Sequence, residues 1–156
     1  MLFLHISDIH FKEKHVDQPD DPNRALRNDL VYDIKLMRKK IGKPATCILL
    51  SGDIAFGGKA AEYDFAFDWL KNEVCPAADC ALTDVFVIPG NHDVDRDAAK
   101  APAQRRAREA LRNLPLGEIE DGVAEYMRDD PSAEVLFGPI ENYNLLNVLI
   151  APQAIC

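Results

Sequence analysis

The sequence lacks the features that would place it in a membrane or in an oxidising compartment. No apolar run reaches the length of about 20 residues that crossing a bilayer takes. Residues 1–6 have neither a basic leader nor a small-residue cleavage site, so they do not form a signal peptide. The four cysteines form no C-x-x-C pair and are too few for a disulfide framework at this length. We therefore expect a cytoplasmic chain with reduced thiols and no membrane partner.

Histidine and positive charge are also scarce. The chain has four histidines, none of them after His92, and its formal net charge is -8. This balance argues against broad nucleic-acid binding, because phosphate-backbone binders present a basic surface. It leaves a phosphate-ester substrate open, since bound divalent cations would reverse the sign of the local field.

Apolar runs that alternate with amphipathic segments predict an α/β fold. Short apolar runs bounded by turn residues predict buried strands at residues 2–6, 46–50 and 85–88. Helices are predicted between them, over residues 22–41 and around residues 63–74. The order strand, helix, strand, helix, strand favours one parallel sheet with right-handed crossovers and helices on its faces.

Two of the helical predictions also name a buried face. In the first helix, apolar residues recur every three or four positions: Leu26, Leu30, Ile34, Met37 and Ile41. Residues 98–156 are predicted to be mainly helical, and near their end Tyr143, Leu146 and Ile150 are expected to face a core. Neither internal repeats nor a linker suggest a second domain.

Three short polar motifs directly follow the predicted strands. They are Asp8-Ile9-His10, Gly52-Asp53 and Gly90-Asn91-His92-Asp93. Because the carboxyl ends of parallel strands meet at one edge of a sheet, the three motifs should converge. Converging carboxylates resist simultaneous ionisation unless a cation neutralises them. The motifs therefore predict a divalent metal site.

The residue types suggest how such a site would be built. His10 adds a nitrogen ligand on the loop of Asp8, and Asp53 can bridge two ions through its two oxygens. The side-chain oxygen of Asn91 can serve the second ion. Mixed oxygen and nitrogen ligation fits manganese, iron or zinc better than a thiolate-selective metal.

A paired-metal centre suits phosphate-ester hydrolysis, because two ions activate a water and clamp the phosphate oxygens. His92, beside the ligand Asn91, is placed to protonate the leaving group as a general acid. Asp93 is placed to orient or polarise the His92 ring. These residues predict an enzyme that acts on phosphate mono- or diesters.

In their order and in their position at strand ends, the three motifs resemble the first three motifs of the calcineurin-like metallophosphoesterase superfamily. G-N-H-D after a strand is fairly specific, and the ordered set is more so. The resemblance implies a dinuclear metallohydrolase with Asp8 and His10 on one metal, Asp53 bridging, Asn91 on the other and His92 assisting. It also implies a four-layer β-sandwich flanked by helices, a plan shared by phosphoprotein phosphatases, cyclic-nucleotide phosphodiesterases and DNA-repair nucleases.

The chain departs from the superfamily pattern in two ways. Residues 54–58 after Asp53 differ from the G-D-x-x-D-R-G of serine/threonine phosphatases, which disfavours that branch. The later histidine motifs, including G-H-x-H, are missing. We therefore expect the N-terminal part of a metallophosphoesterase domain, an incomplete sandwich with a metal-motif core at residues 1–97 and a helical segment at residues 98–156. Its two metal ions would be weakly held or absent.

Three alternatives remain open at this point. The chain could be a catalytically inactive fragment, or a regulatory or interaction module that retains the fold. It could be a nuclease, which salt-dependent nucleic-acid binding would support and the acidic balance disfavours. The absent ligands could also come from the missing C-terminal half or from a second chain in a homo-oligomer.

Overall fold

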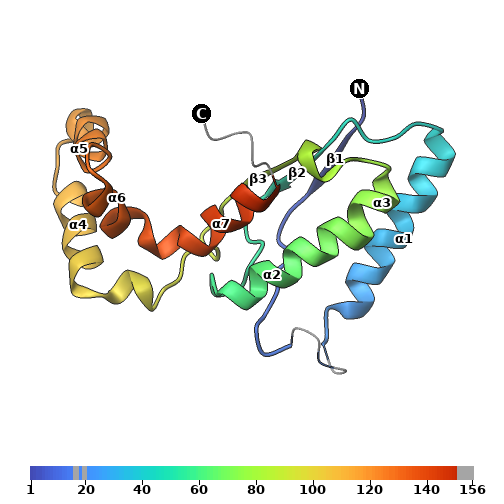
Figure 1. The fold of residues 1–156 in the computed structure, drawn as a ribbon, viewed down its shortest axis with the longest axis horizontal. Coiled ribbons are helices and arrows are strands. Elements are labelled where there is room, and N and C mark those ends of the chain that lie inside the picture. The colour runs from blue at the N-terminus through green and yellow to red at the C-terminus, as the bar shows by residue number, and fades with distance from the viewer. Residues whose placement is uncertain (16–17, 19–20, 151–156) are drawn as a thin grey trace.

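The computed structural model describes residues 1–15, 18 and 21–150. Figure 1 shows their arrangement. The strands are β1 (Phe3–Ile6), β2 (Cys47–Ser51) and β3 (Val85–Ile88). The helices are α1 (Arg24–Ile41), α2 (Ala60–Trp69), α3 (Cys75–Ala78), α4 (Pro102–Arg112), α5 (Ile119–Tyr126), α6 (Asp130–Phe137) and α7 (Glu141–Ile150).

The three strands form one parallel sheet in the order β1-β2-β3, which confirms the predicted α/β fold. Leu4 pairs with Ile48, and Ile48 pairs with Val85. Side chains on this face of the sheet pack into the helical core, where Ile48 is 0% exposed. Alternate residues lie on the other face, and Phe3, Leu49, Phe86 and Ile88 are exposed there. Among the described residues, helices therefore cover one face of the sheet and leave much of the other face open.

The first helix buries only part of the face that its apolar periodicity predicts. Leu26 is 70% exposed, whereas Arg27, Val31 and Ile34 are buried. The reason is that Arg27 pairs with Asp21 and lies over the rings of Phe11 and Phe65. This paired cation takes a core position, and Leu26, one residue before it, faces solvent. The helix also begins at Arg24, two residues later than predicted.

The second predicted helix is a continuous helical rod in which one segment is π-helical. Its α2 and α3 parts are joined by a π-helical segment, Leu70–Val74. Pro76 follows at the start of α3, where its missing N–H cannot continue an ordinary helical ladder. The π-helical segment accommodates the hydrogen bond that Pro76 cannot make. Trp69, Leu70 and Val74 stay buried along this segment. The rod packs against α1 along α3 and against α7 along α2.

The helices after β3 fall into two groups. Three of them, α4, α5 and α6, contact one another and project from the body, as Figure 1 shows. The last helix, α7, returns to contact α2 and β3, and it buries Tyr143, Leu146 and Ile150 as the sequence predicted. Among the described residues, none of the helices combines the length and the apolar character that a bilayer span requires.

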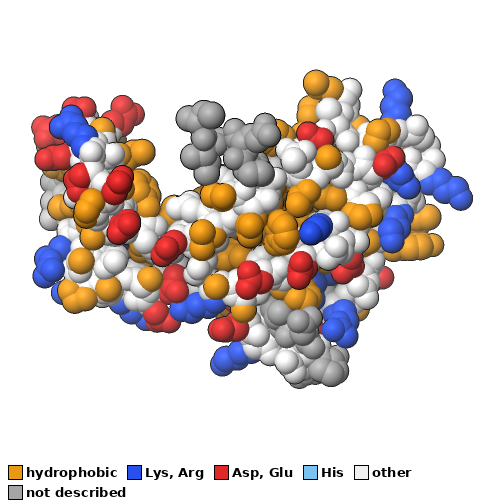
Figure 2. Space-filling view, in the orientation of Figure 1, with side chains coloured by type: hydrophobic (Ala, Val, Ile, Leu, Met, Phe, Trp, Pro, Cys, Tyr) orange, Lys and Arg blue, Asp and Glu red, His pale blue; other side chains and the backbone are white. Residues whose placement is uncertain are grey.

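Charged side chains are scattered over the surface in view in Figure 2, and apolar side chains lie between them, many of them near the middle of the view. Basic residues gather at the C-terminal end of α1, where Arg38, Lys39 and Lys40 occupy the last turn. Cations at this end offset the partial negative charge of the helix dipole. Helix stability and the ion pair between Arg38 and Asp79 at 3.0 Å are roles that this cluster has in the fold.

Candidate metal centre

The loops that follow β1 and β2 continue side by side beyond the ends of the strands. The amide of His10 donates to the Asp53 carbonyl at 3.0 Å, and the amide of Phe11 donates to the Ile54 carbonyl at 2.9 Å. The Gly52 amide donates to the Ile88 carbonyl at 2.8 Å, which ties the end of β2 to the end of β3. The three predicted motifs therefore meet at one edge of the sheet.

Two glycines allow the second and third loops to approach closely. Gly52 has a φ of 79°, in the left-handed region that glycine adopts without strain. A Cβ added at this residue would lie 3.2 Å from the Gly90 Cα, and one at Gly90 would overlap the Asp53 carboxylate. The space occupied by the Asp53 side chain thus exists because residue 90 has no side chain.

Three of the predicted ligands have a left-handed backbone. The φ angles are 58° at Asp8, 54° at His10 and 53° at Asp53. Each costs a non-glycine residue roughly 1 kcal/mol or more. The loop hydrogen bonds described above hold two of these residues in place. Strain of this kind clusters where side chains must be aimed at a ligand.

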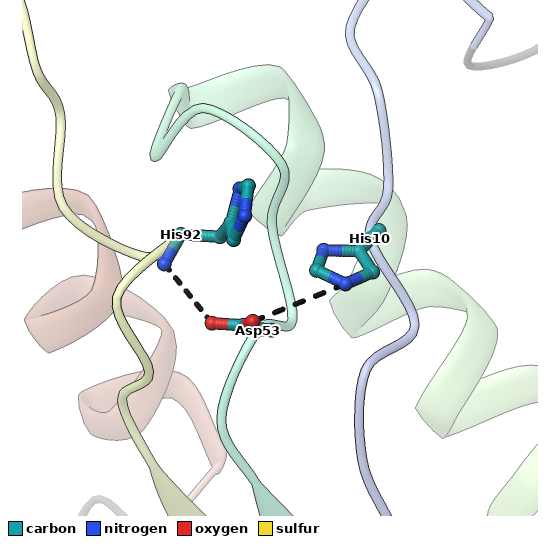
Figure 3. A group of neighbouring side chains, drawn as sticks. All are labelled: His10, Asp53 and His92. Atoms are coloured by element: carbon teal, nitrogen blue, oxygen red, sulfur yellow. Dashed lines mark hydrogen bonds and ion pairs between the residues drawn. The ribbon is translucent and has the colours of Figure 1, made fainter.

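His10, Asp53 and His92 form the centre of the site (Figure 3). One ligand atom of each residue lies within 4.8 Å of the other two. The Asp53 Oδ1 accepts a hydrogen bond from the His92 amide at 3.0 Å, so the third loop fixes this carboxylate. Asp8 lies next to the group, with Oδ1 3.9 Å from the His10 Nε2.

The donor set and its spacing fit a metal ion. The His10 Nε2 lies 3.9 Å from oxygens of both Asp8 and Asp53, which is too far for a hydrogen bond. Two ligand bonds of about 2.1 Å each can span up to roughly 4.2 Å, so one ion can bridge such a pair. The His10 Nδ1 is buried, and no described residue is its hydrogen-bond partner. The His10 imidazole therefore lies beside two carboxylates without hydrogen bonding to them. A divalent cation could bind the imidazole and the carboxylates together.

The His92 ring is oriented by a backbone carbonyl. Its Nδ1 lies 2.9 Å from the Phe56 carbonyl oxygen, which can only accept. In a neutral ring Nδ1 therefore carries the proton, and the lone pair is on Nε2. The Phe56 ring lies 5.1 Å from the His92 ring and 6.1 Å from the His10 ring, centre to centre. The ammonium of Lys12 lies 4.0 Å from the centre of the same Phe56 ring.

Asp93 lies beneath the site and is 1% exposed. Its carboxylate accepts hydrogen bonds from the amides of Ile54, Ala55 and Gly90, at 3.2, 2.9 and 2.8 Å, and from the Tyr63 hydroxyl at 2.9 Å. Burial, followed by the negative charge of Asp93, raises the pKa of Tyr63, so this hydroxyl stays a donor. None of these four bonds goes to the His92 ring. The sequence predicted that Asp93 orients or polarises this ring. Asp93 instead joins the second loop to the third.

Asn91, the remaining predicted ligand, lies between Gly90 and His92, and its side chain is exposed. The sequence did not single out Phe56 and Tyr63, which orient His92 and Asp93. Helical spacing gave Tyr63 an ordinary core role, and no local pattern marks the Phe56 carbonyl. Both contacts depend on pairings across at least 30 residues.

Comparison with known proteins bears on this geometry. The model of the calcineurin-like phosphoesterase family matches residues 1–149. An uncharacterized metallophosphoesterase-like protein, YydB of Bacillus subtilis (strain 168), is 31% identical over 98 residues. That alignment covers 63% of this chain and 18% of the relative, so the chain spans less than a fifth of that protein.

Proposed function

Because this chain belongs to the calcineurin-like phosphoesterase family, we propose that it carries the metal site of a hydrolase for phosphate mono- or diesters. The observation that carries the proposal is the meeting of His10, Asp53 and His92, which come from loops after three parallel strands. Family membership supports metal-dependent phosphoesterase chemistry, and the cluster provides side chains that could bind the metal ion.

We assign Asp8 and His10 to one ion, Asp53 to both ions and Asn91 to the second. The mixed oxygen and nitrogen donors suit manganese, iron or zinc. When bound, the ions would lower the pKa of a water molecule and offset the negative charge of the phosphate ester. The chain itself contributes the fixed position of Asp53, which the His92 amide and the close approach of Gly90 define.

His92 is proposed as the proton donor to the leaving group. Its Nδ1–H is directed to the Phe56 carbonyl, which leaves Nε2 to take up and release a proton. Protonated at Nε2, the ring would donate to the oxygen that departs from phosphorus. Asp93 is proposed as a positioning residue, because it holds the amides of Ile54, Ala55 and Gly90 around the site.

Lys12 is proposed to pair with the substrate's phosphate oxygens. Its ammonium lies over Phe56, whose ring borders both histidines of the cluster. Lys12→Met should then raise the KM for a phosphomonoester and leave kcat nearly unchanged. An unchanged KM would contradict this assignment.

The cytoplasm is the proposed location. The described cysteines, Cys47, Cys75 and Cys80, are free thiols, and we take the low cysteine content as typical of a reducing compartment. Burial raises the pKa of Cys75 to about 11, so this thiol stays protonated and unreactive near neutral pH.

The experiment compares wild type, Asp53→Asn and His92→Gln for Mn²⁺ binding and for turnover of a phosphomonoester and a phosphodiester reporter. We expect wild type to bind Mn²⁺ and Asp53→Asn to bind it at least about tenfold more weakly. His92→Gln should keep its Mn²⁺ affinity and lose about 10²–10⁴-fold in rate, the usual contribution of a general acid.

Each other outcome identifies a different error. Loss of Mn²⁺ affinity in His92→Gln would make His92 a ligand rather than the acid. Metal binding by wild type without turnover of either ester would favour an inactive or regulatory module. Failure of wild type to bind Mn²⁺ would contradict the proposal.

A further inference from the structure

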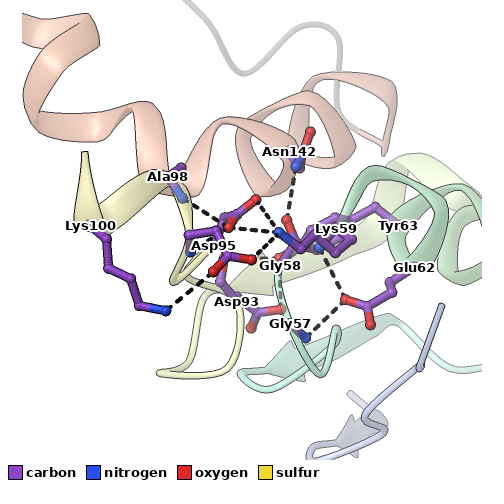
Figure 4. Close-up of polar contacts among 11 residues, drawn as sticks. Gly57, Gly58, Lys59, Glu62, Tyr63, Asp93, Asp95, Ala98, Lys100 and Asn142 are labelled. Carbon is purple, nitrogen blue, oxygen red and sulfur yellow. Dashed lines mark hydrogen bonds and ion pairs between the residues drawn. The ribbon is translucent and has the colours of Figure 1, made fainter. Parts of the chain in front are cut away.

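Glu62 is a buried acid that contacts two of the three loops of the metal centre. It is the third residue of α2 and is 3% exposed. Its Oε1 accepts from the Glu13 amide at 3.1 Å, and its Oε2 accepts from the amides of Gly57 and Lys59 at 2.9 and 3.0 Å. Figure 4 shows Glu62 beside Gly57 and Lys59.

Ordinary helix capping explains only one of these bonds. A glutamate at the third helical position commonly accepts from the amide that precedes the helix, which here is Lys59. Glu13 lies in the loop after β1, three residues beyond His10, and it is 49 residues from Glu62. Gly57 lies in the loop after β2, four residues beyond Asp53. Two of the three bonds therefore hold metal-bearing loops rather than the helix end.

Backbone amides, rather than a cation, satisfy this carboxylate. The nearby ammonium of Lys59 is directed to Asp95 at 2.9 Å and to Asp97 at 3.1 Å. A buried carboxylate is tolerated only when its oxygens are hydrogen-bonded. If the Glu13 loop moved away from the Gly57 loop, at least one oxygen of Glu62 would lose its donor, at a substantial free-energy cost. Glu62 therefore opposes separation of the two loops.

We propose that Glu62 is a positioning residue that sets the spacing between the loop of Asp8 and His10 and the loop of Asp53. It contacts neither the metal donors nor the expected substrate, and it acts on metal affinity through the two backbones that it joins. The inference rests on the proposed function, because it takes the cluster to be a metal site. Under this proposal α2, which carries no metal ligand, controls how tightly the site binds the metal ion.

The test measures Mn²⁺ affinity in Glu62→Gln by calorimetry, with urea unfolding of the metal-free protein measured beside it. The variant has the same shape, but one carboxylate oxygen becomes an NH₂ group that faces an N–H donor. We expect Mn²⁺ affinity to fall about tenfold or more, the range seen when groups that support metal ligands are lost. The Co²⁺-loaded variant should also show an altered visible spectrum, because the ligand spacing changes.

Asp21→Asn is the matched control. Asp21 is also a largely buried carboxylate. It holds the Asn23 amide and Arg27 at the start of α1, and neither partner belongs to the loop of Asp53. This variant should lose stability and keep both its Mn²⁺ affinity and its Co²⁺ spectrum. The comparison separates a general loss of stability from a change in the spacing of the two loops.

Equal Mn²⁺ affinity in wild type and Glu62→Gln would overturn the positioning role alone. Failure of wild type to bind Mn²⁺ would instead overturn the proposed function and the positioning role with it. If Glu62→Gln does not fold, hydrogen exchange of the wild-type amides tests the positioning role instead. Protection of the amides of Glu13, Gly57 and Lys59 should rise together when Mn²⁺ is added, and unchanged protection would overturn the proposal.

Discussion

Gly90 is the residue at which the second and third loops of the metal centre come closest. An added Cβ would overlap the Asp53 carboxylate and would lie 2.5 Å from the Asp53 amide nitrogen. The Asp53 nitrogen belongs to the backbone and the Asp53 carboxylate is held by the His92 amide, so neither can swing aside as the end of a flexible side chain can. We expect Gly90→Ala to displace Asp53 and to weaken Mn²⁺ binding at least about tenfold.

The control for this change is Gly117→Ala, because a Cβ at Gly117 would meet no atom within 4 Å. Titration calorimetry with Mn²⁺ on both variants is the measurement. Binding by Gly90→Ala that matches binding by Gly117→Ala would show that the loops can separate without loss of the site.

Asp93 accepts four hydrogen bonds while almost fully buried, and this makes it sensitive to replacement by an isosteric amide. In Asp93→Asn, an NH₂ group would face amide donors that now lie 2.8–3.2 Å from the carboxylate. We expect the free energy of unfolding to fall by about 2–3 kcal/mol, the penalty for buried polar groups left unpaired.

Tyr63→Phe removes only one of the four donors to Asp93 and should cost about 1 kcal/mol. Urea unfolding of both variants without metal tests the difference. If Asp93→Asn were no less stable than Tyr63→Phe, the amides around Asp93 would have other acceptors.

At the scale of single elements, the strands were the easiest to predict and the buried face of α1 the hardest. Each strand lies within one residue of its predicted bounds, because short apolar runs end at turn residues such as Gly52 and Gly90. The predicted face of α1 was confirmed at Ile34 and wrong at Leu26, because Arg27 enters the core when it is paired with Asp21. That pairing depends on tertiary structure, and apolar periodicity contains no sign of it.

The candidate metal site could also be predicted only in part. The convergence of His10, Asp53 and His92 followed from strand order, because parallel strands present their carboxyl ends at one edge. The parts that hold these residues could not be predicted. Glu62 and the Phe56 carbonyl act through contacts across 36 to 49 residues, which no local spacing reveals.

The ion pairs between the N-terminus of α2 and the segment after β3 should make stability depend on pH. Burial acts to raise the pKa of Asp95, but hydrogen bonds from Lys59 and from the amides of Ala98 and Asp97 bring that pKa below its ordinary value of 3.8. Hydrogen bonds to Asp95 and Asp97 raise the pKa of Lys59 above 10.5. Asp95 therefore stabilises the fold above about pH 4, and this contribution is lost as the pH falls through its lowered pKa.

Asp95→Asn should lower the free energy of unfolding near pH 7 by up to about 1 kcal/mol, the size expected of a partly exposed ion pair. Its difference from wild type should narrow below pH 4. It should also narrow when the pH rises through the raised pKa of Lys59, since that ammonium then loses its charge. Urea unfolding across this pH range is the measurement, and a difference that is the same at pH 3 and pH 7 would contradict the ion-pair origin.

At the scale of the whole molecule, the open face of the sheet exposes several large apolar side chains. Phe3, Phe86 and Ile88 are 55%, 58% and 62% exposed on this face, and β3 forms one edge of the sheet. Contiguous apolar side chains on a sheet face favour association with another apolar surface, because burial removes them from water. We expect the isolated chain to self-associate at high concentration through this face.

Phe86→Lys should lower that association by placing a charge among the exposed apolar side chains of this face while leaving the buried face of β3 unchanged. Leu116→Lys is the matched control, because Leu116 is 92% exposed, lies outside the sheet and gains the same charge. Sedimentation velocity over a concentration series should show a smaller weight-average mass for Phe86→Lys than for wild type and Leu116→Lys. If both variants shift the mass equally, net charge controls the association, and if wild type remains a monomer throughout, the open face does not drive it.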